Sequence, residues 1–238
     1  MQNIVILTGA GVSAESGIAT FRAADGLWEK HRIEDVATPE GFARDPALMQ
    51  RFYDTRRAAV QAAKPNTAHM ALARLGREWT GEVLLVTQNV DDLHERAVGS
   101  AGASGALHMH GELLSVLCTA CGKRHRWTGQ LSDGPPCPAC DAQALRPDIV
   151  WFGEMPYGMD RIYAALGQAD LFVSIGTSGA VYPAAGFVAE AKAAGARTLE
   201  LNLERSEGSH LFDETRQGRA GALVPEWVDE MLENAGQR

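Results

Sequence analysis

Short apolar runs recur along the chain, separated by longer amphipathic stretches. Four runs are rich in branched side chains and are bounded by glycine or polar residues: Ile4 to Leu7, Val83 to Val86, Leu171 to Ile175 and Thr198 to Leu201. Such runs are typical of buried parallel strands. The stretches between them include Pro65 to Leu75 and Ala184 to Ala194, where apolar residues recur at three- and four-residue steps as in helices. The alternation predicts an α/β fold with an open, doubly wound parallel sheet.

Two segments break this alternation. Residues 26–64 indicate mainly charged helices and loops, and residues 115–144 hold all four cysteines and the turn signal Gly134-Pro135-Pro136. We assign both to a smaller domain inserted into the larger one. The expected ranges are 1–26, 76–115 and 145–238 for the large domain, with a helical module at 27–75 and a cysteine-bearing module at 116–144.

Composition narrows the class of protein. The chain has 238 residues, 45% hydrophobic and 22% charged, which suits one globular domain with an insertion. A formal net charge of -8 opposes a broad nucleic-acid surface and is compatible with lysine-bearing partners. No basic leader or membrane-length apolar run is present in the sequence, so we expect a cytoplasmic protein without membrane or nucleic-acid partners. The oligomeric state stays open, with a monomer as the working expectation.

A glycine-rich loop, GAGVSAESGIATFR, follows the first apolar run. Its Gly9-x-Gly11-x-x-Ala14 spacing matches the dinucleotide fingerprint of Rossmann-like domains, in which a tight turn and the start of a helix receive a diphosphate. The spacing would equally suit a turn between strand and helix that binds nothing. A dehydrogenase would continue into a second strand ending in an acidic residue, whereas residues 21–28 contain no strand-like run. The loop therefore predicts a dinucleotide held differently, with Asn202 as a candidate ribose contact.

The cysteines form two CxxC pairs, Cys118 with Cys121 and Cys137 with Cys140, and fifteen residues lie between the pairs. This spacing is that of a four-thiolate zinc ribbon, in which four protein ligands leave no position for water, so the zinc would be structural. The alternatives to a zinc site are a redox dithiol or a chance pairing of cysteines. If zinc is bound, the ribbon could instead belong to a nucleic-acid-binding module, which the acidic composition of the chain opposes.

Polar residues follow several of the predicted strands. Gln88, Asn89 and Asp91 come directly after the second strand, at the edge where open α/β sheets bind ligands, although Asn89 or Asp91 could instead cap a helix. His108 and His110 alternate just before the cysteine module, so only one would face a given side of an extended segment, and either could be a structural histidine or a general base. The run Ser174 to Ser178 supplies further small polar groups.

Taken together, these motifs resemble the sirtuin family. GAGVSAESGIATFR is similar to its cofactor loop, TQNVDDLHERA (87–97) to its nicotinamide and ribose segment, His110-Gly111 to its catalytic histidine, and the paired CxxC to its zinc site. GTS (176–178) and NLE (202–204) are similar to its adenosine-side contacts. The order agrees as well, and the resemblance runs from about Val5 to about Val224.

The resemblance implies an NAD-consuming protein-lysine deacylase with one structural zinc. It gives catalytic roles to His110, Asn89 and Asp91, and places the following residues around NAD: Gly9, Ala10, Gly11, Glu15, Phe21, Arg22, Gln88, Asn89, Asp91, Gly176, Thr177, Ser178, Asn202 and Ala220. The acyl oxygen of the modified lysine would attack the nicotinamide ribose and release nicotinamide. His110 would then activate a ribose hydroxyl, and the products would be 2′-O-acyl-ADP-ribose and free lysine.

The resemblance also bears on the substrate. Val150, Phe152, Gly153 and Glu154 are similar to the family's substrate-groove strand, beside which a peptide would add as a strand. Tyr53 and Arg56 are three apart, on one face if the segment is helical, and could grip a carboxylate, although such pairs are also common on solvated helices. They resemble the Tyr-x-x-Arg of sirtuins that remove succinyl and malonyl groups, and Ala37 resembles the small residue of their pocket. Acetyl-lysine should also be accepted.

Two other classes remain possible at this point. A mono-ADP-ribosyltransferase would also consume NAD but would release nicotinamide without an acylated lysine. A noncatalytic zinc-ribbon protein would ignore NAD and bind nucleic acid with strong salt dependence.

Overall fold

A six-stranded parallel sheet forms the centre of the larger domain. The computed structural model describes residues 2–19, 27–28, 31–99 and 105–236. The strand order is β11-β10-β9-β1-β4-β5, and every neighbouring pair is parallel. The strands are β1 (Ile4–Thr8), β4 (Val83–Thr87), β5 (Leu107–His108), β9 (Leu171–Ile175), β10 (Arg197–Asn202) and β11 (Glu214–Gln217). The four predicted strands are confirmed as β1, β4, β9 and β10.

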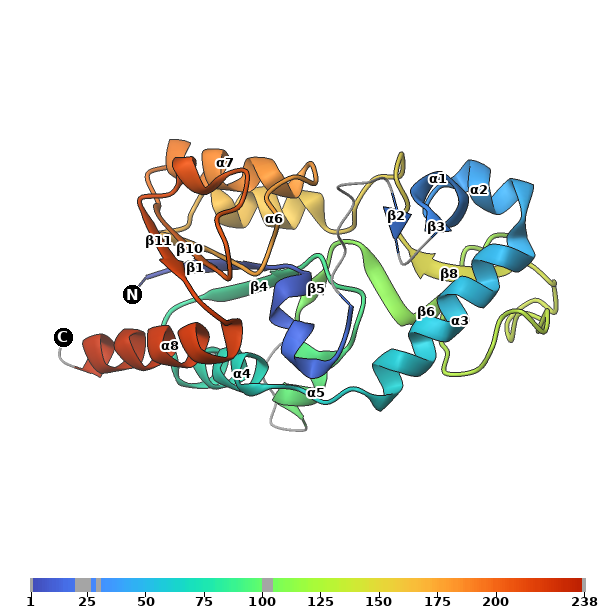
Figure 1. Ribbon diagram of the computed structural model, residues 1–238, viewed down its shortest axis with the longest axis horizontal. Coiled ribbons are helices and arrows are strands. Elements are labelled where there is room, and N and C mark those ends of the chain that lie inside the picture. Colours follow the sequence, from blue (N-terminus) through green and yellow to red (C-terminus); the bar gives the residue numbers. More distant parts are fainter. Residues whose placement is uncertain (1, 20–26, 29–30, 100–104, 237–238) are drawn as a thin grey trace.

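Helices cover both faces of this sheet, as Figure 1 shows. Helices α4 (Thr67–Glu78) and α8 (Ala220–Gly236) lie on one face, and α6 (Met159–Leu166) and α7 (Phe187–Ala193) lie on the other. Successive side chains of β1 alternate between the two layers: Ile4 and Ile6 pack with α4 and α8, whereas Val5 and Leu7 pack with α6 and α7. The period of two explains why a strand buried on both faces is apolar throughout.

The strand order creates a reversal beside β1. The chain passes from β1 to β4 and β5 on one side, and later from β9 to β10 and β11 on the other. The connections after β1 and β9 therefore leave in opposite directions. Open α/β sheets bind ligands in the crevice that such a reversal makes at the carboxyl ends of the strands.

The smaller domain combines helices with an antiparallel sheet, to the right in Figure 1. Its helices are α1 (Ile33–Val36), α2 (Pro39–Arg44) and α3 (Pro46–Ala62), and its sheet has the order β7-β6-β8. The strands are β6 (Gly111–Cys118), β7 (Arg124–Arg126) and β8 (Leu145–Ile149). Helix α3 begins sharply because Pro46 occupies its first turn and the Asp45 carboxylate accepts the Leu48 N–H at 2.9 Å.

Three sequence expectations need revision or comment. Residues 27–28 do form a strand, β2 (Leu27–Trp28), but it pairs antiparallel with β3 (His31–Arg32), outside the main sheet. Residues 150–154, expected to be the substrate-groove strand, form a loop, because regular pairing ends with β8 at Ile149; peptide binding there stays a prediction. The domain ranges stay a prediction, although the packing of α4 on the main sheet favours ending the helical module near Asn66. Among the described residues, no helix has the length and apolar character needed to cross a membrane.

Candidate active site

The loop after β1 and the loop after β9 touch through three glycines. The N–H of Gly11 donates to the carbonyl oxygen of Gly176 at 2.8 Å. A Cβ atom on Gly9 would lie 2.8 Å from the oxygen of Gly176, and one on Gly11 would lie 2.7 Å from its Cα. Gly176 itself has a φ of +62°, a conformation that side chains disfavour. The glycines therefore let the two loops approach closely at the reversal of the sheet. Together they form a backbone cradle that would suit a diphosphate.

The sequence predicted an α-helix directly after this loop, and that prediction is wrong. Two 3-10 turns follow instead, η1 (Ala10–Val12) and η2 (Ala14–Ser16), and they end at Gly17 with a φ of +83°. Within the described residues, the loop is therefore not followed directly by an α-helix whose dipole could help to bind a diphosphate. Phe21 and Arg22, expected near the cofactor, lie outside the residues that the structure describes.

Glu15 connects the turns to the last helix. Its carboxylate accepts the N–H of Gly221 at 2.9 Å, next to Ala220 at the first position of α8. Two residues predicted to border the cofactor are thus brought together, although they are more than two hundred positions apart in the chain.

Thr177 is the meeting point of three predicted segments. Its hydroxyl accepts a hydrogen bond from the Gln88 side chain at 3.1 Å, and its carbonyl oxygen accepts one from the Asn202 side chain at 2.7 Å. The neighbouring Ser178 hydroxyl accepts the Ala180 N–H at 3.3 Å. These contacts hold the carboxyl ends of β4, β9 and β10 at one edge, as the sequence predicted for a ligand-binding edge.

Asn89 and Asp91 meet at Ser13, which the sequence analysis did not single out. The Ser13 hydroxyl donates to Asp91 Oδ2 at 2.9 Å and accepts from Asn89 Nδ2 at 3.1 Å. Asp91 Oδ1 also accepts the Leu93 N–H at 3.1 Å, but the N-cap of α5 (Leu93–Val98) is Asp92, so the expectation that Asn89 or Asp91 caps this helix is wrong. Burial raises the pKa of Asp91, while the bonds from Leu93 and Ser13 oppose that rise.

Two buried histidines lie behind Ser13, and the sequence analysis missed both. His94 Nε2 lies 3.0 Å from the Thr8 hydroxyl, and the rings of His69 and His94 are 4.8 Å apart. Burial lowers the pKa of His69 to about 4 and that of His94 to about 3, so both are neutral at physiological pH. For His69 the sequence offered only a local signal, the helix cap at the start of α4, where the Asn66 side chain accepts the N–H groups of Ala68 and His69.

His108 and His110 both reach the segment after β4. The chain turns at residues 109–110, so the segment is not extended over both histidines and the alternation expected of an extended segment does not apply. His108 Nδ1 lies 3.1 Å from the carbonyl oxygen of Asn89, and His110 Nδ1 lies 3.1 Å from that of Gln88.

The pKa values of the two histidines are shifted in opposite directions. Burial alone would lower the pKa of His108, but the Glu95 carboxylate 3.1 Å away outweighs it and the pKa is raised. Burial lowers the pKa of His110, and only the hydrogen bond to Gln88 opposes that fall. His108 is therefore the partner in an ion pair, whereas His110 is the neutral imidazole that can act as a base.

The four cysteines converge at one end of the small sheet. Their sulfur atoms all lie within 4.8 Å of one another, with Cys118 and Cys140 at 3.7 Å and Cys121 and Cys137 at 3.8 Å. These separations are far longer than the S–S bond of about 2.05 Å, and they suit four thiolates around one tetrahedral ion. The donor set fits zinc.

The predicted acyl-selecting pair lies on α3 and faces the interior. Tyr53 and Arg56 are both buried, in or beside an apolar cluster that includes Val36 and Trp151. The Arg56 guanidinium lies over the Phe52 ring, 3.2 Å from its centroid. Burial raises the pKa of Tyr53, so its phenol stays protonated. The helical spacing is confirmed, and the solvated-face alternative is wrong.

The residues predicted to bind the peptide line a loop after β8. Val150 N–H donates to the carbonyl oxygen of His110 at 2.9 Å, and Phe152 N–H donates to that of Ala37 at 2.9 Å. Phe152 is 45% exposed, and Gly153 has a φ of +92°. The Glu154 carboxylate instead accepts from Arg146 and from the Trp151 N–H. The loop thus joins His110 to Ala37 through backbone hydrogen bonds.

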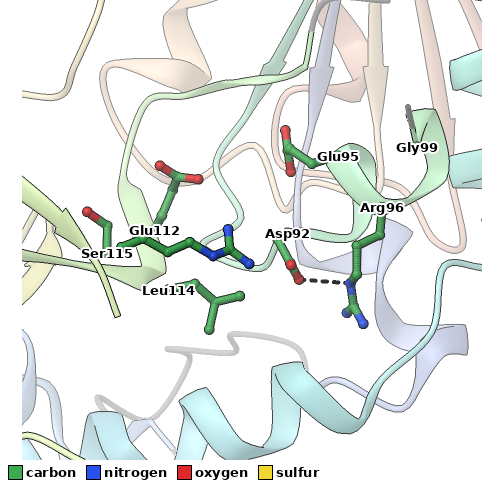
Figure 2. Close-up of a pocket in the computed structure, with 8 residues that line it drawn as sticks. Asp92, Glu95, Arg96, Gly99, Glu112, Leu114 and Ser115 are labelled. Atoms are coloured by element: carbon green, nitrogen blue, oxygen red, sulfur yellow. Dashed lines mark ion pairs between the residues drawn. The ribbon is translucent and has the colours of Figure 1, made fainter. Parts of the chain in front are cut away.

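A cavity of about 530 Å³ lies between α5 and β6 (Figure 2). An ion pair between Asp92 and Arg96, 3.0 Å long, forms part of its wall. Most of its lining residues are charged; the full set is Asp92, Glu95, Arg96, Gly99, Glu112, Leu114, Ser115 and Arg126. None of them belongs to the predicted site, so this cavity is not where those residues converge.

Comparison with known proteins agrees with this geometry. The Sir2 family model matches residues 9–183. The chain is 58% identical to an NAD-dependent protein deacylase of Shigella flexneri over 233 residues, 97% of this chain and 84% of that protein. A protein of the same name from Escherichia coli strain K12 is 57% identical over 232 residues, 96% of this chain and 82% of that one.

Solved structures show the same fold. A Sir2 homologue in complex with NAD has a TM-score of 0.86 and 40% identity, with 98% of this chain and 90% of that chain covered. A Sir2 protein bound to acetylated peptide has a TM-score of 0.80 and 27% identity, with 98% and 93% covered.

Proposed function

Since the chain belongs to the Sir2 family and is an NAD-dependent protein deacylase, we propose that it removes acetyl and, preferentially, succinyl and malonyl groups from lysine side chains. The products would be nicotinamide, 2′-O-acyl-ADP-ribose and free lysine. Its substrates would be acylated lysines presented on proteins, as a Sir2 relative with a bound acetylated peptide suggests.

NAD is the cosubstrate, and one zinc ion is structural. When bound, NAD supplies the ribose that accepts the acyl group. The glycine cradle of Gly9, Gly11 and Gly176 would receive its diphosphate, and Ala10 would border it. Thr177, Ser178 and Asn202 would meet the adenosine side, with Glu15 and Ala220 supporting the loop at α8.

His110 would supply the base. A carbonyl oxygen can only accept, so the contact with Gln88 places the hydrogen on Nδ1 and leaves the lone pair on Nε2. That lone pair would take a proton from a ribose hydroxyl. Gln88, Asn89 and Asp91 would form the nicotinamide pocket, with Ser13 fixing the last two. The protein's main work would be to orient a weak nucleophile and to exclude water.

The observation that supports an acidic acyl preference is the burial of Arg56 beside Tyr53. Arg56 is 9% exposed and Tyr53 is fully buried, one helical turn apart. Arg presents a planar donor fork that would suit the carboxylate of a succinyl or malonyl chain, and the phenol would add a further donor. Ala37 would leave room for the chain.

The test compares acetylated and succinylated versions of one lysine peptide, incubated with and without NAD and followed by mass spectrometry. We expect NAD-dependent removal of both groups. In Arg56→Met, desuccinylation should fall by about tenfold or more while deacetylation changes little, because an acetyl group has no carboxylate that depends on the guanidinium. Arg51→Met is the matched control, since Arg51 is exposed on the same helix.

Two outcomes would contradict the proposal. Equal losses of both activities in Arg56→Met would remove the acyl preference. Release of nicotinamide at the same rate without any acylated peptide would indicate an ADP-ribosyltransferase or a glycohydrolase activity instead.

A further inference from the structure

We propose that Trp151 is a positioning residue for acyl selectivity, which orients the Tyr53 phenol toward the carboxylate of an acidic acyl group. The inference rests on the proposed function, because it names a further determinant of the same pocket. Trp151 lies in the loop after β8, far from α3 in the sequence.

The contact that carries the inference joins two buried rings. The indole Nε1 of Trp151 lies 3.1 Å from the Tyr53 hydroxyl oxygen, and Trp151 is 2% exposed. An indole N–H only donates, so the phenol oxygen must accept this bond. The phenol hydrogen then cannot point at Trp151. Trp151 therefore restricts the directions in which Tyr53 can donate.

The indole is itself held in place from several sides. The Arg146 guanidinium carbon lies 3.6 Å from the Trp151 ring centroid, and Phe42 packs against the ring with centroids 5.2 Å apart. Arg146 is buried and binds both oxygens of Glu154 at 2.8 Å. The same carboxylate accepts the Trp151 N–H at 2.9 Å. A bidentate pair and a cation–π contact together leave the indole little freedom.

This arrangement suggests a different role for Glu154. The sequence placed it in contact with substrate, but its carboxylate is engaged with Arg146 and the Trp151 backbone. Glu154 thus acts on the pocket through Trp151. The backbone N–H of Phe152, the residue after Trp151, donates to the carbonyl oxygen of Ala37. The loop therefore contacts both the Tyr53 phenol and Ala37, the small residue that we place beside the acyl chain.

The first experiment is Trp151→Phe, which keeps an aromatic ring but removes the N–H. We expect kcat/KM for the succinylated peptide to fall roughly tenfold relative to the acetylated one, the effect of disturbing one hydrogen bond to a charged group. Trp127→Phe is the matched control. The Trp127 indole nitrogen is buried and has no hydrogen-bond partner in the part of the chain that the structure describes, so its removal should leave the ratio unchanged.

A double-mutant cycle tests whether the effect passes through Tyr53. In a Tyr53→Phe background, Trp151→Phe should cause no further fall in the succinyl-to-acetyl ratio. A purely structural role would lower the ratio, or both activities, equally in either background and would overturn the proposal.

The outcomes separate this inference from the proposed function. An unchanged ratio in Trp151→Phe, while Arg56→Met lowers it, overturns the role of Trp151 alone. An unchanged ratio in both variants overturns the acyl preference itself. Should Trp151→Phe fail to fold by circular dichroism, Glu154→Gln carries the test. Glu154→Gln weakens the contact with Arg146 but keeps the indole. We therefore expect a smaller fall in the succinyl-to-acetyl ratio, and an unchanged ratio would contradict the proposal.

Discussion

The Nδ1 atom of His110 lies 3.1 Å from the carbonyl oxygen of Gln88. That contact fixes the tautomer of the ring and points Nε2 away from the segment after β4. Burial lowers the pKa of the ring below its usual 6.5, so His110 is neutral at physiological pH. One contact between neighbouring loops thus leaves Nε2 available for the role of base that we propose for His110.

His110→Ala should abolish deacylation, by at least about a hundredfold, because general-base catalysis is lost. Exchange of labelled nicotinamide into NAD should survive, since nicotinamide leaves before His110 acts. In the unmodified protein, kcat should fall as the pH drops through the lowered pKa of His110, with a midpoint below 6.5. Loss of exchange in step with deacylation, or a midpoint above 6.5, would argue against this role.

Gly11→Ala should weaken NAD binding and destabilise the fold by about 1–3 kcal/mol, because its Cβ would overlap the Gly176 backbone. The measurements are the KM for NAD and urea unfolding. Gly76→Ala is the control, since Gly76 lies within α4 with nothing within 4 Å of the added atom. It should stabilise the helix by about 1 kcal/mol and leave the KM unchanged. Equal behaviour of the two variants would refute the close approach.

Zinc removal should unfold the cysteine-bearing module. All four cysteines of the chain belong to the cluster, so a thiol reagent reports on the cluster directly. We expect one zinc ion per chain and little thiol reactivity before chelation, and four reactive thiols with a lower Tm after it. Four reactive thiols and no zinc in untreated protein would contradict a structural site.

Acid should destabilise the protein through the buried histidines. Their pKa values are lower in the folded chain than the usual 6.5, so the unfolded chain binds protons first as the pH falls. Their contribution is complete above pH 6.5 and is lost below it, toward about pH 4 for His69 and about pH 3 for His94. Each lowers the free energy of unfolding by up to about 1.4 kcal/mol per pH unit.

The corresponding test is urea unfolding of His94→Gln between pH 7.5 and about pH 5, compared with His210→Gln at an exposed histidine. The first variant should show a shallower loss of stability with acid than the unmodified protein, and the second should not. A slope that His94→Gln leaves unchanged would show that this ring is not the group responsible.

Features that depend only on a few neighbouring residues could be predicted from the sequence. Glycine spacing at Gly9 and Gly11 and the spacing of the CxxC pairs reflect what a turn and a metal ion require over a few residues. The helical register of Tyr53 and Arg56 was predictable for the same reason. The same local reasoning was wrong where a distant loop competes: after Gly11, contact with Gly176 accompanies 3-10 turns where an α-helix was expected.

The sequence by itself determined four of the six strands of the parallel sheet, the cysteine cluster and the segments that meet at the sheet edge, because apolar period and ligand spacing are carried by neighbouring residues. Only the tertiary structure decided which histidine is neutral, since that depends on whether Glu95 or a bare carbonyl oxygen faces the ring. It also decided that Trp151 holds Tyr53 across 98 residues of chain. Contacts of that kind follow from how α3 and the loop after β8 pack together, which no local pattern encodes.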